Sequence, residues 1–114
     1  MRFETLPGFD KDFKRLQKKY RSLESDIETM KILLKSRPNA RPPFSFRVDN
    51  LGIDTPIIKV KKIASDSLKG KGVNSGLRLI YAWFPEEERI VFIEIYHKSE
   101  KEREDQGRIL GWLG

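Results

Sequence analysis

The sequence predicts a single α+β domain, residues 1–114, in which an antiparallel sheet carries a helical hairpin on one face. Three observations lead to this fold class. A length of 114 residues suits one domain with a small core. Apolar residues in the range 9–34 recur at helical spacing. In the range 76–100, two runs rich in Ile, Val, Leu and aromatic residues flank a short polar link, which is typical of a β-hairpin.

The helical stripe in residues 9–34 repeats its apolar positions at spacings of three and four. A short alternation in residues 2–6 precedes it and predicts a first strand, which a proline–glycine pair ends. The stripe fits one long helix or coiled-coil segment, or two helices broken near residues 20–22 with Ser22 as the second N-cap. A lone helix of this length would leave its stripe without a partner, so the hairpin is the favoured prediction.

The second half of the chain predicts three further strands and a final helix. Residues 37–50 hold three prolines and predict a loop, which Phe44 and Phe46 are expected to anchor. Residues 57–64 are rich in β-branched side chains and predict a strand that precedes the hairpin. The run 100–113 is charged at first and apolar near its end, which predicts a short docking helix. The expected order is therefore β-α-α-β-β-β-α.

Alternation along these strands assigns side chains to the two faces of the sheet. Lys59 and Lys61 share one face of their strand, opposite Ile58 and Val60. In the last strand, one alternating set is expected to form core: Val91, Ile93 and Ile95. The other set is expected to lie on an open face: Glu94, Tyr96 and Lys98.

The charge of the chain is uneven along its length. Residues 1–84 hold 18 Lys and Arg against 9 Asp and Glu, whereas residues 85–114 hold 5 against 8, so the net charges are +9 and −3. A basic surface of this kind suits a polyanion or an acidic protein as partner, although it also serves as an ordinary solubilising surface. The sequence has no cysteine, no signal-peptide core and no apolar run of about 20 residues, so we expect a cytoplasmic protein without a membrane partner.

The available residue types argue against a metal or cofactor site. His97 is the only histidine and cysteine is absent, so zinc would lack its preferred ligands. Three adjacent glutamates, residues 86–88, lie in the predicted hairpin turn and are expected to be solvated. We therefore expect no metal and no cofactor.

Cleavage of RNA needs only the residue types that this chain does supply. The 2′-hydroxyl can attack the neighbouring phosphate once a base, an acid and positive charge are in place. The candidate catalytic residues are Lys59, Lys61, Arg78, Tyr96 and His97. The candidate RNA-binding residues are Lys62, Lys69, Lys71 and Lys98. Most of the first group, with Lys98, come from three successive strands and can gather on the sheet face opposite the helices.

The sequence resembles the RelE/ParE superfamily of prokaryotic toxins in two segments, Gly76-Leu-Arg-Leu-Ile-Tyr and Phe92-Ile-Glu-Ile-Tyr-His-Lys-Ser-Glu-Lys. Members tend to show a Lys-x-Lys strand, then Gly-x-Arg-x-x-Tyr, then a β-branched strand that ends in a lysine-containing segment. This chain matches with Lys59-Val60-Lys61, Arg78 and Lys98. The resemblance covers nearly the whole chain, and it includes the order of elements.

The resemblance implies a RelE-like toxin of a type II toxin–antitoxin system, an mRNA endoribonuclease that acts on the translating ribosome and its rRNA. A cognate acidic antitoxin would neutralise it. Lys59 and Lys61 would bind phosphate or transfer protons, and Arg78 would stabilise transition-state charge. His97, beside Tyr96, corresponds to a histidine that some related toxins carry at the end of this strand.

The chain departs from the RelE pattern at two positions. Ser99 stands where an arginine is common, and Asp105 stands where a tyrosine is common. Either Tyr96 and His97 substitute for the missing groups, or cleavage is weak. Two further hypotheses follow: a ParE-like toxin that binds DNA gyrase without being an enzyme, and an inactive binding module.

Overall fold

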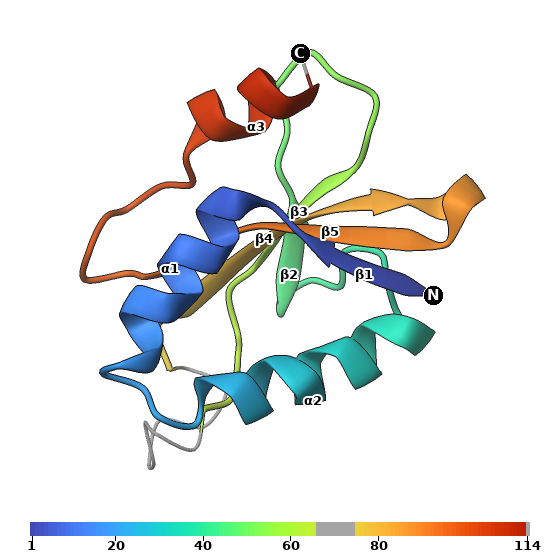
Figure 1. Cartoon of the computed structure of the whole chain (residues 1–114). Helices are drawn as coiled ribbons and strands as arrows, with labels where there is room; N and C mark the ends of the chain where they lie inside the picture. Colours follow the sequence, from blue (N-terminus) through green and yellow to red (C-terminus); the bar gives the residue numbers. More distant parts are fainter. Residues whose placement is uncertain (66–74, 114) are drawn as a thin grey trace.

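The computed structural model describes residues 1–65 and 75–113, and Figure 1 shows their arrangement. The sheet stands between two helices on one side and a third helix on the other. The strands are β1 (Arg2–Thr5), β2 (Ser45–Arg47), β3 (Ile57–Val60), β4 (Leu77–Phe84) and β5 (Arg89–His97). The helices are α1 (Pro7–Gln17), α2 (Leu23–Ser36), the short 3₁₀ helix η3 (Pro85–Glu87) and α3 (Gln106–Leu113).

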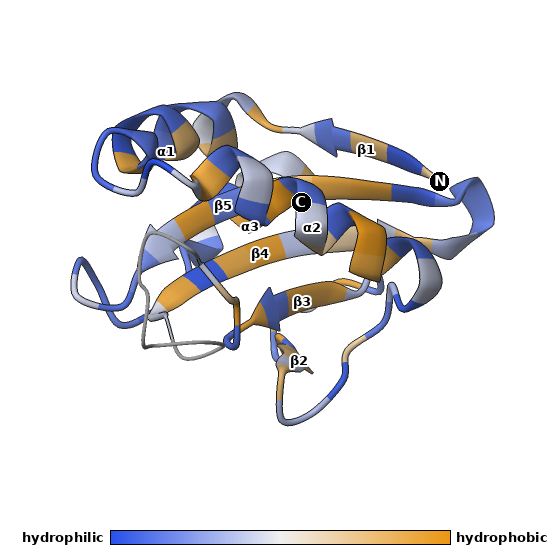
Figure 2. Cartoon of the chain, turned by 90° about the horizontal axis from the view of Figure 1, so that it is seen from below, coloured by the Kyte–Doolittle hydropathy of each residue, from blue (hydrophilic) through white to orange (hydrophobic). Residues whose placement is uncertain are grey.

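The sheet has five strands in the order β1-β5-β4-β3-β2. Strands β3, β4 and β5 form the predicted antiparallel meander, and β2 extends it as an antiparallel edge that was not predicted. Strand β1 adds a parallel edge beside β5, so the sheet is mixed. The two long central strands, β4 and β5, are hydrophobic along most of their length in Figure 2. Because such strands are covered on both faces, their sequences form nearly continuous apolar runs instead of a strict alternation.

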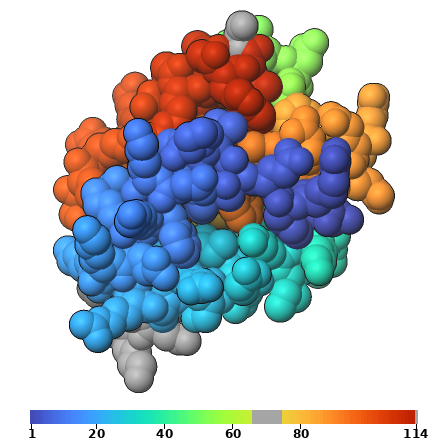
Figure 3. All heavy atoms as spheres, viewed as in Figure 1, coloured from blue at the N-terminus to red at the C-terminus, as the bar shows by residue number. Residues whose placement is uncertain are grey.

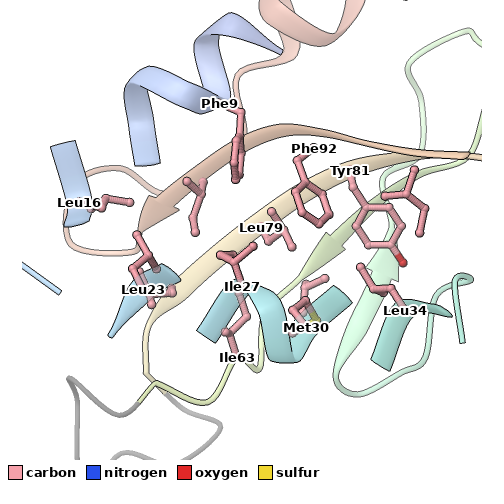
Figure 4. Close-up of a cluster of buried hydrophobic side chains, with 14 of the residues drawn as sticks. Phe9, Leu16, Leu23, Ile27, Met30, Leu34, Ile63, Leu79, Tyr81 and Phe92 are labelled. Atoms are coloured by element: carbon pink, nitrogen blue, oxygen red, sulfur yellow. The ribbon is translucent and has the colours of Figure 1, made fainter. Parts of the chain in front are cut away.

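The helical hairpin is confirmed. Helices α1 and α2 pack against one face of the sheet, and the stripe that predicted them forms the larger core (Figure 4). Ser22 takes the N-cap position of α2, but its hydroxyl donates to the Asp26 carboxylate, 2.8 Å away, and accepts no capping hydrogen bond from a backbone N–H group of the helix. The helix contribution to this core comes from Phe9, Leu16, Leu23, Ile27, Met30 and Leu34.

A β-bulge breaks the alternation of β5. Ile80 pairs with Glu94, but its neighbour Tyr81 pairs with Phe92, so Ile93 has no partner opposite it. Beyond the bulge the faces exchange, and Ile95 packs under the helical hairpin while Ile93 packs on the opposite face. The expectation that alternate residues of this strand share one core face was therefore wrong for Ile93 and Ile95.

The C-terminal segment, residues 100–113, covers part of the second face of the sheet. Helix α3 docks through the fully buried Ile109, and Trp112 meets the ring of Phe84 edge-on at 6.0 Å. In Figure 3 this segment, in red, lies directly against α1. Within it, Lys101 forms an ion pair with the buried Glu94 carboxylate, which also accepts the backbone N–H of Asp105 at 2.8 Å.

The C-terminal segment buries two residues that were expected to lie on an open face, so that expectation was wrong for them. Glu94 and Tyr96 are each only 1% exposed, whereas Lys98 is exposed as predicted. The acidic C-terminal residues fold back over the polar row of the sheet, and strand alternation alone does not reveal that cover.

The predicted loop contains the short edge strand β2, which pairs with β3. Three residues are too few to show an alternation in the sequence, and the surrounding prolines favoured a loop. Phe44 and Phe46 do not anchor this stretch in the core, because 41% and 38% of their surfaces remain exposed. Within the described residues, no helix is long and apolar enough to cross a membrane.

Candidate nucleic-acid interface

Four cationic side chains meet at a cavity of about 180 Å³ at one end of the sheet. They come from three places in the chain: the residues that follow β3, the start of β4, and the residue after β5. This cationic cavity is lined by Pro43, Lys61, Lys62, Gly76, Arg78 and Lys98. No acidic residue lines it within the described part of the chain. The excess of positive charge in a concave site favours an anion such as a phosphate.

Backbone groups hold the cationic residues in place. The Arg78 guanidinium donates through Nη1 to the carbonyls of Lys61 and Leu77, at 2.9 and 3.3 Å. The backbone N–H groups of Lys61 and Lys62 both donate to the Phe44 carbonyl, at 2.9 and 3.2 Å. Residues 1–65 and 75–113 provide no ion-pair partner for these four side chains, so their charge remains available to a ligand.

Gly76 connects the cavity to the end of β5. Its φ of +89° lies in the left-handed region, and a Cβ at this position would lie 2.6 Å from Nε2 of His97. Its carbonyl also accepts the backbone N–H of Lys98 at 2.8 Å. Both the backbone conformation and the close imidazole therefore require glycine.

His97 does not face the cationic cavity. Its ring stacks on Tyr20, with 5.7 Å between ring centroids, on the side of the sheet that α1 and α2 cover. Nε2 lies 3.1 Å from the Ser75 carbonyl, and Nδ1 lies 3.1 Å from the backbone nitrogen of Ser99. Because a carbonyl only accepts and an N–H only donates, these contacts fit a neutral ring protonated at Nε2. The imidazole thus ties together the ends of β4 and β5.

Lys59 and Tyr96 share the predicted face with Arg78, but the C-terminal segment covers them. The Lys59 ammonium lies 3.1 Å from Oε1 of Glu104, and 13% and 10% of these two side chains are exposed. Burial favours a lower pKa for Lys59, but the neighbouring Tyr96 hydroxyl and Glu104 carboxylate outweigh it and raise the pKa. For Glu104 the effects have the opposite sign. Burial alone would raise its pKa, and the Lys59 ammonium is the main reason that the pKa is lowered instead.

The structure therefore brings together only part of the predicted set. Lys61, Lys62, Arg78 and Lys98 line one cavity, whereas Lys59, Tyr96 and His97 do not line it. Lys69 and Lys71, also predicted to bind RNA, lie outside the described residues. In the part of the chain that the structure describes, no group of three or more His, Cys, Asp or Glu residues could hold a metal ion.

Comparison with solved structures identifies the architecture. The archaeal RelE–RelB complex from Pyrococcus horikoshii OT3 contains a chain that superposes with a TM-score of 0.56 at 15% identity, over 88% of this chain and 97% of that one. A copper-bound mutant toxin from Helicobacter pylori superposes equally well, at 13% identity over the same shares. This chain has a RelE-like toxin fold. Neither the protein-family models nor the curated protein sequences give a match.

The two departures from the RelE sequence pattern have structural roles in this version of the fold. The Ser99 hydroxyl lies 2.8 Å from Nδ1 of His97. The Asp105 carboxylate accepts the Arg108 backbone N–H at 2.9 Å and so caps the start of α3. Each residue fixes the local backbone, and neither side chain lines the cationic cavity.

Sequence reasoning missed two acidic residues that bind cationic side chains, Glu104 in the C-terminal segment and Asp12 on α1. Glu104 binds Lys59, and Asp12 binds Arg108 at 2.7 Å and accepts the backbone N–H of Ile95 at 3.3 Å. For Glu104 one signal was available, namely the acidic excess of residues 85–114 against the basic remainder, whereas Asp12 lies outside that range. The acidic excess indicates that the C-terminal region folds back onto basic strands, but it does not say which lysine is paired.

Proposed function

We propose that this protein is a toxin of a type II toxin–antitoxin system that binds and cleaves mRNA on the ribosome. The observation that carries the proposal is the cationic cavity on a RelE-like fold, in which Lys61, Lys62, Arg78 and Lys98 converge and which no acidic residue lines among residues 1–65 and 75–113. RNA recognition depends largely on phosphate contacts, and a convergent set of lysine and arginine side chains supplies them. Contact with rRNA would use the same chemistry.

The proposed reaction uses the 2′-hydroxyl of the substrate as the nucleophile. Attack on the neighbouring phosphate forms a bond from O2′ to phosphorus and breaks the bond to the leaving O5′, with negative charge building on the non-bridging oxygens. Arg78, held by two carbonyls, would stabilise that charge. Lys61 and Lys98 would neutralise the phosphate and move protons to or from O2′ and O5′. No step in this scheme draws on a metal ion.

An adjoining surface, which shares Lys62 with the cationic cavity, suits an acidic protein partner. An apolar groove of about 300 Å³ lies between α2 and the β2–β3 edge, and its floor includes Met30, Leu34 and Val60. Arg37 and Arg41 contribute positive charge to its lining. An antitoxin segment with apolar side chains and flanking carboxylates would match this combination. The structural neighbour from Pyrococcus comes from a RelE–RelB complex.

One observation favours a second candidate, a toxin that poisons its target without cleaving RNA. Neither Tyr96 nor His97 lines the cationic cavity, so among the described residues the groups at the phosphate site are lysines and one arginine. A ParE-like protein that binds DNA gyrase would need no acid or base there. The two candidates differ in what happens to mRNA when growth stops.

The test is controlled expression in a bacterial host, with growth recorded and the 5′ ends of mRNA mapped. For an mRNA endoribonuclease, growth arrests together with cleavage inside translated reading frames, and Arg78→Ala removes both effects while thermal unfolding remains cooperative. Arg2→Ala is the matched control, because Arg2 is an exposed arginine on β1, at the opposite edge of the sheet from β2. Growth arrest with intact mRNA and loss of DNA supercoiling would replace the proposal with the gyrase candidate. Unaffected growth would overturn both.

A further inference from the structure

The edge strand β2 places an exposed aromatic ring beside the cationic cavity. Phe46 pairs with Lys59 across the β2–β3 ladder, and directly opposed residues point to the same face of a sheet. Its side chain therefore lies on the face that carries the cationic residues, and its ring is 38% exposed.

Lys61 connects this ring to the cavity. Its ammonium nitrogen lies 5.2 Å from the centroid of the Phe46 ring, within the range of a cation–π contact, and the same side chain lines the cavity with Arg78. The Phe44 carbonyl accepts the backbone N–H groups of Lys61 and Lys62, and Pro43 lines the cavity. The segment that carries the ring is thus fixed against the segment that carries the charge.

Single-stranded nucleic acids are bound by this combination of chemistry. Cationic groups follow the phosphates, and exposed aromatic rings stack with the bases, largely without regard to sequence. An exposed ring beside cationic side chains offers both contacts to adjacent parts of one nucleotide chain, and the described residues supply those side chains with no acidic partner.

We propose that Phe46 is a stacking platform, which binds the base of a single-stranded RNA nucleotide whose phosphate occupies the cationic cavity. The inference rests on the proposed function and deepens it, because it defines the substrate as unpaired RNA and adds a positioning residue. Stacking on Phe46 orients the nucleotide so that Arg78 faces the phosphate. The contact reads the flat face of the base, so it selects single strands over duplexes and adds little preference among bases.

The chain offers a matched control for this proposal. Phe44 lies two residues earlier and is exposed to a similar degree, 41%, but it lines the apolar groove and not the cationic cavity. Phe44→Leu and Phe46→Leu thus remove equivalent rings from two surfaces. Phe46→Tyr keeps an aromatic face at the platform and tests whether the ring itself is what matters.

The experiment measures the binding of a short oligouridylate with 2′-O-methyl groups, which 2′-hydroxyl attack cannot cleave. A sugar–phosphate oligomer of equal length without bases is the second probe. Phe46→Leu should weaken binding of the first probe about tenfold, as expected for the loss of one stacked base. It should leave binding of the second probe unchanged, and Phe46→Tyr and Phe44→Leu should bind both probes as the parent does.

Other outcomes overturn the proposal in distinguishable ways. If Phe46→Leu binds the oligouridylate as tightly as the parent, while Arg78→Ala binds it weakly, the platform is wrong and the phosphate site stands. Equal losses for Phe44→Leu and Phe46→Leu, or for both probes, would also overturn stacking at this position. If the parent binds neither probe, the platform and the phosphate site both fail, and the mapping of mRNA 5′ ends during growth arrest decides the proposed function separately.

Discussion

Lys59 and Lys61 stand two residues apart at the end of β3, yet they are in opposite situations. Lys59 is largely buried and bound to Glu104, with a raised pKa, and it lies beneath the C-terminal segment. Lys61 is exposed, lines the cationic cavity, and has no ion-pair partner among the described residues. One face of the sheet is thus divided into a covered half and an open half.

The division shows that the same residue type on the same strand can serve stability or binding, depending on what covers it. Residues 100–113 neutralise the covered half, because Glu104 pairs with Lys59 and Lys101 pairs with Glu94. The buried Ile109 packs this segment against the sheet. The open half keeps its positive charge because this segment does not reach it. We therefore propose that the covered half stabilises the fold and that the open half binds the ligand.

The largest expected effect comes from loosening the cover itself. Ile109→Ala removes a fully buried side chain from the contact between α3 and the sheet and should lower the free energy of unfolding by about 2–5 kcal/mol. Leu110→Ala, at a neighbouring position that is 36% exposed, should change it by less than about 0.5 kcal/mol. Denaturant titration of both variants measures the difference. Equal losses would mean that α3 docks differently.

The open half depends in turn on the geometry at Gly76. Gly76→Ala places a Cβ in a left-handed conformation and against His97, so it should cost about 2–4 kcal/mol. Gly52→Ala is the control for the backbone alone, because its φ is +72° but nothing lies within 4 Å of a Cβ there, and about 1–2 kcal/mol is expected. Chemical denaturation compares the two. A Gly52→Ala loss as large as that at Gly76 would remove the role given to the His97 contact.

A smaller effect should be the pH dependence of stability, which is expected to come from the ion pair in the covered half. The pKa of Glu104 is lowered below its usual value of 4.5, so this carboxylate stabilises the folded state above that pH. The contribution is lost as the pH falls through the lowered, folded-state value. The free energy of unfolding, measured from neutral to acid pH, should fall less steeply for Glu104→Gln than for the parent. Glu102→Gln, an exposed neighbour, should follow the parent curve, and a Glu104→Gln curve parallel to the parent would contradict the pairing.

Much of this organisation follows from local patterns in the sequence. The stripe from Phe9 to Leu34 predicted helix because its spacing repeats many times, and two helices were favoured because one long helix would leave its stripe without a partner. The hairpin of β4 and β5 was predictable because both strands are long and rich in β-branched and aromatic residues. Lys61, Arg78 and Lys98 were also predictable as neighbours, since strand alternation places them at one end of one face.

The remaining features depend on contacts between distant parts of the chain. The bulge at Ile93 reverses the faces of β5, and nothing in the local alternation marks it. The burial of Tyr96 depends on residues of the C-terminal segment, and the His97 ring packs so close to Gly76 that a Cβ would not fit there. Sequence patterns assign side chains to a face, but they do not say which part of that face another segment will cover.

The most direct test of the division is to truncate each lysine of the pair and measure two properties of each variant. Lys61→Ala should weaken the binding of 2′-O-methyl oligouridylate and reduce the salt dependence by about one phosphate contact, with little change in the free energy of unfolding. Lys59→Ala should lower the free energy of unfolding by about 1–3 kcal/mol, because it leaves the Glu104 carboxylate without its partner, and it should leave RNA binding intact. If Lys59→Ala weakens RNA binding as much as Lys61→Ala does, the covered half takes part in binding and the division is wrong.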